Sequence, residues 1–365
     1  MSAALLTFSL PLSHSLYLPP PSPPSFFPQP SSTMSIDMSS NFFKLLMHFR
    51  RHDLQSFEKE HAELFEQAKA KGDHLAVTSH YYSVMSGVID QYFNGNFHFA
   101  PPEQDGQLLE DALHDLHVTI GERLGLDRNT KCVDIGCGIG GVIKDLASTG
   151  ADLTGVTIAP NEVEMGNADF KEMGVSSHCR LVEGDAHNMP LEDGSMDAAY
   201  AVYALKYFPR IDRVMREIAR VLKPGGKVLI YDLLKTDLYD EHNEEHVKVI
   251  EGLEYACGMP SLHSRQLMIE TAEECGLRLC YEEDLSETYH RPFHYCFSHS
   301  PLFMWLVKSP VVDSLIKIAQ SLRILPAGFA SFNRTFLSGT VQKIVDAGEM
   351  GILSGSKILL FQKDC

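Results

Sequence analysis

Hydrophobic positions in the first part of the chain recur at helical spacing and then give way to short runs typical of strands. Between residues 41 and 93, Phe57, Leu64 and Ala68 fall on one helical face. A further helix is predicted from about residue 108 to 125. Beyond it, apolar runs alternate with helical patterns, beginning with "KCVDI", "ADLTGVTI", "CRLVEGDA", "MDAAYAVYAL" and "GGKVLIYDLL". This alternation predicts an α/β fold, a parallel doubly wound sheet with helices on both faces.

The alternation stops after the last of these runs. "LRLCYEEDL" (277–285) and "SKILLFQKD" (356–364) read as two more strands, separated by about 70 residues of another pattern. Within this insertion, residues 300–329 are apolar enough to lie against lipid, to line a lipid-sized pocket or to pack as an ordinary core. No run of about 18 apolar residues occurs, so we predict no membrane span.

The composition of the chain indicates its cellular location and the kinds of partner that it can bind. The first 33 residues contain no Asp, Glu, Lys or Arg, and prolines interrupt them, so we interpret 1–33 as a disordered extension. The formal net charge of −17 argues against a nucleic-acid partner. Eight cysteines without paired spacing indicate reduced thiols and a cytoplasmic location. Attachment to the endoplasmic reticulum membrane and assembly into a homo-oligomer stay open.

A glycine motif follows the first predicted strand in "VDIGCGIGG". Gly136, Gly138 and Gly140 let backbone amides approach a ligand, and the helix after them presents its amino end. A dinucleotide-binding dehydrogenase would carry its acid about 20 residues after the glycines, whereas here Asp134 precedes them. The spacing resembles class I methyltransferases, whose fold is Rossmann-like, and implies S-adenosylmethionine as the cofactor.

Two later segments support the same cofactor, "EGDAHNMP" and "LKPGGKVLI" (222–230), the latter resembling the turn and fifth strand that class I methyltransferases commonly carry, whereas Thr157 departs from their pattern. In "EGDAHNMP", Asp185 and Ala186 follow the third strand, where similar enzymes bring an acid to the adenine amino group. At the end of the second strand, where such enzymes place a ribose-binding acid, this chain has Thr157. We therefore expect a neutral and weaker ribose contact there.

Several longer stretches resemble the sterol methyltransferase family. They are "SHYYSVMSGVIDQYFNGNFHFAPP" (79–102), "GMPSLHS" (258–264), "YEEDLSE" (281–287) and the terminal block that begins "LRILPAGFASFNRTFLSG". With "NFFKLLMHFRRHDL" included, the chain is most similar to the nematode enzymes that methylate carbon 4 of the sterol nucleus. The resemblance implies four parts: an extension (1–33), a helical N-terminal region (34–107), a methyltransferase core (108–298) and a sterol methyltransferase C-terminal domain with the last strand (299–365).

Aromatic residues are plentiful in two segments of the family-like regions. The first contains Phe93, Phe97 and Phe99, and the second contains Phe293, Tyr295, Phe297, Phe303 and Trp305. Aromatic faces suit a flat ring system such as a sterol, although each residue alone would also suit a core. Histidines and a cysteine in the second segment lack the spacing of a metal site, so we predict no metal.

The segment "YAVYALKYFP" contains the predicted catalytic residues. Enzymes of the family that methylate the sterol side chain at carbon 24 usually present a glutamate here, but this chain has Tyr203. Methylation at carbon 4 beside a 3-ketone would instead pass through an enolate, which a phenol or an ammonium would stabilise. Tyr203, Lys206 and Tyr207 are the candidate stabilisers and His98 the candidate base, unless Lys206 and Tyr207 cap the strand and face solvent. Methylation of another lipid or amine, and a non-enzymatic sterol carrier, are the competing functions.

Overall fold

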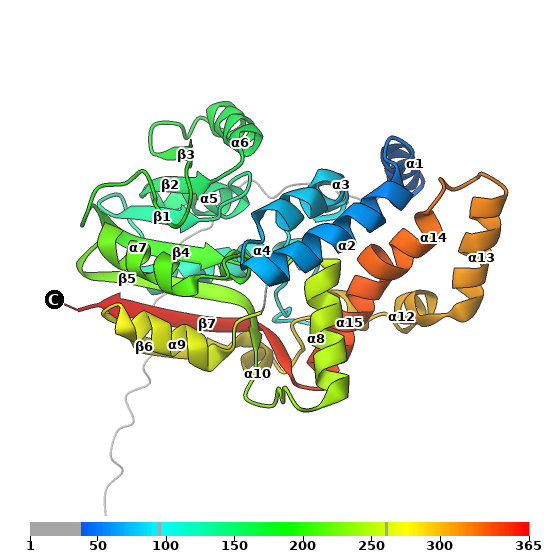
Figure 1. Ribbon diagram of the computed structural model, residues 1–365. Helices are drawn as coiled ribbons and strands as arrows, with labels where there is room; N and C mark the ends of the chain where they lie inside the picture. The colour runs from blue at the N-terminus through cyan, green and yellow to red at the C-terminus, as the bar shows by residue number, and fades with distance from the viewer. Residues whose placement is uncertain (1–37, 94–95, 260–261, 365) are drawn as a thin grey trace, which may run out of the picture. The chain divides into compact units, whose positions relative to one another are not determined.

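The computed structural model describes residues 38–93, 96–259 and 262–364 (Figure 1). Residues Ser39–Cys365 group into one compact unit. The extension predicted for 1–33 lies outside the described residues, and the boundaries expected near 107 and 298 stay predictions.

A single mixed sheet forms the centre of this unit. Its order is β3-β2-β1-β4-β5-β7-β6. The first five strands pair in parallel, whereas β7 runs antiparallel to both of its neighbours. The strands are β1 (Lys131–Ile135), β2 (Asp152–Thr157), β3 (Cys179–Glu183), β4 (Met196–Val202), β5 (Leu222–Lys235), β6 (Leu277–Asp284) and β7 (Leu353–Lys363). The predicted α/β fold is confirmed, and the chain reverses strand order beside β1, where open α/β sheets bind ligands.

Helices cover both faces because successive strand residues point to opposite sides. In β4, Tyr200 belongs to one apolar cluster, and its neighbours Ala199 and Ala201 belong to the other. The first cluster includes residues of α4 (Leu109–Leu124), α5 (Gly141–Leu146) and α6 (Pro160–Glu172). The second includes residues of α7 (Ile211–Val221) and α9 (Arg265–Glu274).

The N-terminal region consists of α1 (Met38–Phe49), α2 (Leu54–Lys71) and α3 (Leu75–Phe93). Asp53 caps α2 by accepting a hydrogen bond from the backbone of Ser56, and Gly72 ends the helix in the left-handed conformation. The helical pattern predicted for this region is therefore confirmed for the described residues.

The insertion between β6 and β7 is helical. It contains α10 (Leu285–Tyr289), α11 (Tyr295–Ser298), α12 (Pro301–Lys308), α13 (Pro310–Ser321), α14 (Phe329–Phe332), a π-helical turn (Asn333–Leu337) and α15 (Ser338–Glu349). In Figure 1, α15 lies beside α8 (Glu244–Ala256), and α14 lies close to α2. Phe332 packs against Phe49 and Phe57, with ring centres 5.4 and 5.5 Å apart. The C-terminal block thus completes the apolar core of the N-terminal helices.

Candidate active site

The glycine motif forms a tight loop between β1 and α5. Gly136, Gly138 and Gly140 have φ values of 74°, 54° and 78°, a region that L-residues with a side chain rarely adopt. A Cβ on Gly136 would lie 2.6 Å from the Cβ of Ala204, so the loop packs directly against the segment that follows β4. This close approach brings the cofactor loop next to the predicted catalytic segment.

Asp134, the next-to-last residue of β1, is a buried acid with an unused oxygen. Its Oδ2 has no hydrogen-bond partner among the described residues, and burial raises the pKa of the carboxyl group to about 8. The hydroxyl of Tyr200 is also buried and unpaired among these residues and opposes this pKa shift, so Asp134 can accept a hydrogen from Tyr200 or from a ligand that carries a donor or a positive charge. S-adenosylmethionine has an ammonium group and a sulfonium, and the loop and the acid fit it.

The carboxylate of Glu162 lies beside Thr157, the last residue of β2. Thr157 donates a hydrogen bond of 2.6 Å to Oε2 of Glu162, which lies in the first turn of α6. Burial raises the pKa of Glu162. The neutral ribose contact was expected because only Thr157, at the end of the strand, was considered. The sequence signal for a carboxylate nearby was Glu162, in the first turn of the next helix.

The third cofactor segment is more exposed. Asp185 follows β3 and accepts hydrogen bonds from the backbone N–H and the ring of His187, at 2.9 and 2.8 Å. Ala186 beside it is buried. The carboxylate of Asp185 is 58% exposed, so a ligand can reach it, and its contact with adenine stays a prediction.

Strand β4 ends earlier than the apolar run suggests. Tyr203, the residue after β4, has φ of 52° and turns the chain into a short 3-10 helix, Leu205–Tyr207. Its buried hydroxyl donates to the backbone oxygen of Gly355 in β7 at 2.8 Å. Burial raises the pKa of this phenol well above its usual value, so it stays protonated. A left-handed tyrosine is strained, and such residues concentrate at functional sites.

Lys206 lies inside the protein and does not cap the strand at the surface. It is 2% exposed, and its ammonium lies 3.6 Å from Oδ1 of Asp232, a fully buried acid near the end of β5. The same ammonium lies 4.6 Å from the ring centres of both Tyr203 and Tyr207. Burial lowers the pKa of Lys206, and the charge of Asp232 opposes this shift. Asp232 is a site residue that no sequence motif indicated.

Tyr207 and His98 complete the group. The hydroxyl of Tyr207 accepts a 2.8 Å hydrogen bond from Tyr82 of α3. His98 is buried with its ring centre 6.0 Å from that of Tyr203. Burial, with the charges of His117 and Lys206, holds the pKa of His98 well below its usual value, so the imidazole is neutral at neutral pH. The structure therefore brings together all four predicted catalytic residues.

Aromatic rings from the two predicted segments meet beside this group. Phe99 lies 5.9 Å from both Phe97 and Tyr203 and 5.1 Å from Phe297, measured between ring centres. Phe297 in turn stacks with Phe303 of α12 at 6.4 Å. The side chain of the predicted Phe93 lies outside the described residues. A continuous set of rings thus leads from the sheet to the insertion.

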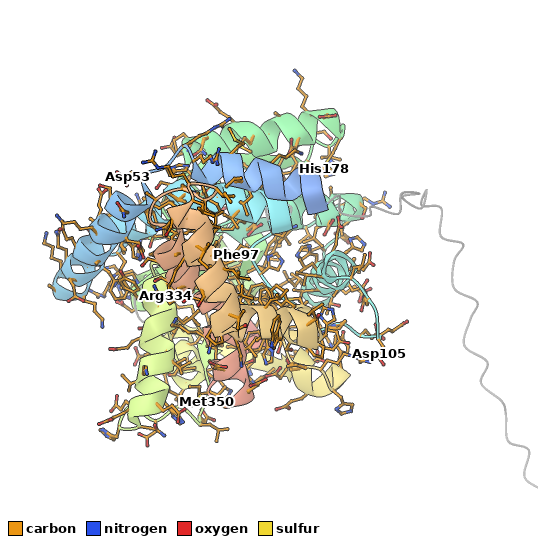
Figure 2. All side chains as sticks on the ribbon, turned by 90° about the vertical axis from the view of Figure 1, so that its right-hand side faces the viewer. Asp53, Phe97, Asp105, His178, Arg334 and Met350 are labelled. Atoms are coloured by element: carbon orange, nitrogen blue, oxygen red, sulfur yellow. The ribbon has the colours of Figure 1, made fainter. Side chains whose placement is uncertain are left out.

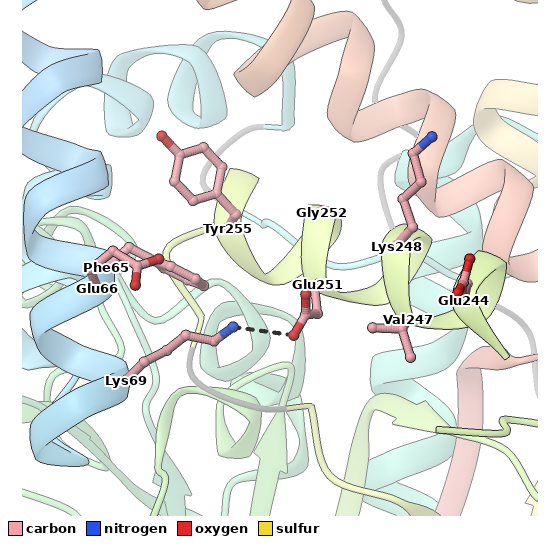
Figure 3. A pocket seen from close by; sticks show the side chains of 9 residues that line it. All are labelled: Phe65, Glu66, Lys69, Glu244, Val247, Lys248, Glu251, Gly252 and Tyr255. Carbon is pink, nitrogen blue, oxygen red and sulfur yellow. Dashed lines mark hydrogen bonds and ion pairs between the residues drawn. The ribbon is translucent and has the colours of Figure 1, made fainter. Parts of the chain in front are cut away.

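A separate hollow lies between α2 and α8 (Figure 3). Its volume is about 500 Å³, and the ion pair of Lys69 and Glu251, 3.2 Å long, crosses it. Glutamates and lysines make up much of its lining, and none of the predicted site residues contributes. Its charge makes it unsuitable for a sterol.

Comparison with known proteins identifies the family. A family model described as a methyltransferase domain matches residues 133–230. The chain is 61% identical to the sterol 4-C-methyltransferase strm-1 of Caenorhabditis elegans over 331 residues, which are 90% of this chain and 99% of that protein. The chain belongs to the sterol methyltransferase family. The resemblance drawn from the sequence motifs is confirmed, and the protein is an S-adenosylmethionine-dependent methyltransferase.

Other, less similar relatives are named for methylation at a different carbon of the sterol. A sterol 24-C-methyltransferase of Yarrowia lipolytica is 32% identical to this family member over 59% of the chain and 56% of its own length. Among solved structures, the [4+2]-cyclase SpnF has a TM-score of 0.57 and 22% identity, covering 78% of this chain and 93% of its own. A geranyl diphosphate C-methyltransferase of Streptomyces coelicolor has a TM-score of 0.56 and 15% identity, with 74% and 92% covered. These structures share the fold.

Among the described residues, no helix combines the length and the apolar character that crossing a bilayer requires. The described side chains also bring together no group of three His, Cys, Asp or Glu residues that could hold a metal ion.

Proposed function

We propose that this methyltransferase adds a methyl group to carbon 4 of the sterol nucleus, using a 3-ketosterol and giving a 4-methylsterol. The observation that carries the proposal is the buried group in which neutral His98 lies beside Tyr203 and the ammonium of Lys206. The relative that is 61% identical and named for this position supports it.

The chemistry follows from the residue types. S-adenosylmethionine, when bound by Asp134 and the glycine loop, supplies an electrophilic methyl group to a carbon nucleophile and leaves as S-adenosylhomocysteine. Beside a 3-ketone, His98 can take a proton from carbon 4, and the electron pair then forms a double bond between carbons 3 and 4 with the charge on oxygen. Lys206 supplies a positive charge for that oxyanion inside a buried site, where electrostatic stabilisation is strongest.

The two phenols are not equivalent in this scheme. Tyr203 already donates its hydrogen to the backbone oxygen of Gly355. Tyr207 shares a 2.8 Å hydrogen bond with Tyr82 in which either hydroxyl can donate, so its hydrogen can turn to a substrate oxygen when Tyr82 is the donor. We therefore propose Tyr207 as the donor to the oxyanion and Tyr203 as the residue that holds the turn after β4.

Methylation of a side-chain alkene is the alternative. That reaction develops a carbocation, and the buried carboxylate of Asp232 would stabilise it. However, the ammonium of Lys206 lies 3.6 Å from this carboxylate and opposes its field. An anionic intermediate beside this ammonium is therefore favoured over a cation beside the carboxylate.

Paired substrates test the proposal. Purified protein with S-adenosylmethionine should methylate a 3-ketosterol at carbon 4 far faster than the matching 3-alcohol, as read by mass spectrometry of the product. Tyr207→Phe should lower kcat on the order of a hundredfold with cofactor affinity unchanged. Tyr281→Phe, which removes a phenol bonded to Glu283 on β6, is the matched control. A methyl group on the side chain, or equal rates for ketone and alcohol, would contradict the proposal.

We also propose that the protein takes its sterol at a membrane surface through α12 and α13. These helices, on the right in Figure 1, face the viewer in Figure 2. Nine large apolar side chains are exposed along this stretch: Leu302, Phe303, Trp305, Leu306, Val311, Leu315, Ile318, Leu322 and Ile324. Residues 38–53 and 300–325 carry six Lys or Arg and two Asp or Glu, in a chain with a net charge of −17. An apolar face with a basic surround suits an anionic lipid surface.

Vesicle flotation tests this contact. The protein should float with phosphatidylserine vesicles, and replacing Trp305 and Leu315 by Ser should abolish this binding while activity on a detergent-dispersed sterol is kept. Leu238→Ser, at an apolar residue 67% exposed elsewhere, is the control. If the wild type ignores vesicles and the Ser variant instead changes a dimer into a monomer, the face is a contact between copies.

A further inference from the structure

A line of polar side chains connects buried His98 with the protein surface. Its Nε2 lies 2.7 Å from Nε2 of His117, whose Nδ1 lies 2.6 Å from Oδ2 of Asp145. The other oxygen of Asp145 lies 3.4 Å from Nδ1 of His114. The side chain of His117 is fully buried, that of Asp145 is 32% exposed and that of His114 is 56% exposed. The line therefore runs from the catalytic group to solvent.

Two helices next to the cofactor loop build this line. His114 and His117 are three residues apart on α4, so both lie on the face that packs against α5. Asp145 is on α5, the helix that begins directly after the glycine motif. The line thus depends on the same loop and helix as the cofactor site.

The hydrogen bonds determine which nitrogen of His98 is the base. An ionised Asp145 can only accept, so Nδ1 of His117 carries hydrogen and its Nε2 has a lone pair. That lone pair accepts the hydrogen on Nε2 of His98. In neutral His98 the lone pair is then on Nδ1, so this nitrogen is the base.

We propose that His98, His117 and Asp145 form a proton relay that carries the proton removed from the sterol to solvent. This inference rests on the proposed methylation at carbon 4. The bond from carbon 4 to hydrogen breaks, its electron pair enters the enolate, and the proton goes to Nδ1 of His98. The proton on Nε2 of His98 moves to Nε2 of His117, and the proton on Nδ1 of His117 moves to Asp145. Water or His114 then takes one proton from Asp145. His98 is left with hydrogen on Nδ1 and His117 with hydrogen on Nε2, so both imidazoles must exchange these hydrogens through water after product release to regain their starting tautomers.

The surroundings of His98 make such a relay necessary. Burial and the nearby charge of Lys206 disfavour a positive imidazole, so a proton taken by His98 cannot stay there. His117 is also fully buried, and its ring lies 2.6 Å from Asp145, so it can pass the proton on to the carboxylate. Asp145 has a negative charge and contact with solvent, so transfer to it moves the positive charge out of the buried site.

Replacing the far end of the line separates a relay from a purely structural network. Asp145→Asn keeps the shape but cannot take up the proton, so it should lower kcat for the 3-ketosterol about tenfold to a hundredfold. KM and the calorimetric affinity for S-adenosylmethionine should stay within about twofold of the parent. The kinetic isotope effect with substrate deuterated at carbon 4 should rise, because proton removal becomes slower relative to methyl transfer. Asp145→Glu should recover part of the rate.

A neighbouring ion pair supplies the matched control. Asp169→Asn removes a carboxylate 2.6 Å from Lys144, also on α5, and should leave kcat unchanged. His117→Ala tests the middle of the line, and added imidazole should partly restore its kcat.

Each result decides a separate point. If the parent methylates carbon 4 and Asp145→Asn has the parental kcat and isotope effect, the relay is wrong and the proposed function stands. A loss of cofactor affinity in Asp145→Asn as large as its loss of kcat would show that the line only supports the cofactor loop, and would also overturn the relay. If the parent does not methylate the ketone at carbon 4, the proposed function fails first.

Discussion

Removing the ammonium of Lys206 should destabilise the protein because the buried carboxylate of Asp232 then has no cation beside it. In Lys206→Met, Asp232 stays fully buried without its cation, which lies 3.6 Å away in the parent. Breaking a buried pair by removing one partner costs roughly 3–5 kcal/mol. The backbone N–H groups of Lys206 and Leu233 still donate to the carboxylate at 3.2 and 2.8 Å, so we expect the low end of this range.

The expected loss is therefore about 3 kcal/mol in the free energy of unfolding, or a fall in Tm of roughly 4–5 °C. Urea unfolding of Lys206→Met, Asp232→Asn and the double variant measures it. The double variant should be more stable than the sum of the single losses predicts, by about 2 kcal/mol, because neither charge is then stranded.

A surface pair is the control for this cycle. Lys223 lies 2.5 Å from Asp197, with side chains 43% and 34% exposed, so solvent screens their interaction. Lys223→Met should cost no more than about 1 kcal/mol. Equal losses for Lys206→Met and Lys223→Met, or strict additivity in the buried cycle, would refute the reasoning about Asp232.

The remaining predictions concern the cofactor site. Gly138→Ala should abolish binding of S-adenosylmethionine in calorimetry, whereas Gly72→Ala, with a similar φ of 68° and equal space around it, should cost only stability. Glu162→Gln should weaken cofactor binding roughly tenfold if its charge contacts the ligand, and unchanged affinity would exclude it from the site. In the cofactor-free protein, the carboxyl group of Asp134 keeps its proton up to about pH 8, whereas in the unfolded chain it loses the proton near pH 4. The free energy of unfolding therefore falls as the pH rises between these two values. Asp134→Asn should therefore gain stability relative to the parent between pH 5 and 7.5 in urea unfolding, and parallel curves would contradict the raised pKa.

Local patterns were sufficient for the sheet and the cofactor loop. Alternating apolar runs predicted β1 to β5 because burial on both faces requires apolar residues along a whole strand. The glycines of "GCGIGG" predicted left-handed turns because few other residues adopt them, and Gly136, Gly138 and Gly140 all do. In "YAVYALKYFP" the residue types suggested candidates for the chemistry, and their catalytic roles stay predictions.

Tertiary packing alone decided how those side chains are paired. Asp232 is 26 residues from Lys206, and Asp145 is 28 residues from His117, so no local spacing relates them. The end of β4 at Val202 depends on Tyr203 reaching Gly355 in β7, a contact across 152 residues. The apolar segment 300–324 has the composition of a core helix, and only the placement of its neighbours leaves its face uncovered. Sequence determines what one stretch of backbone prefers, whereas the charge state of a buried group depends on which distant atoms surround it.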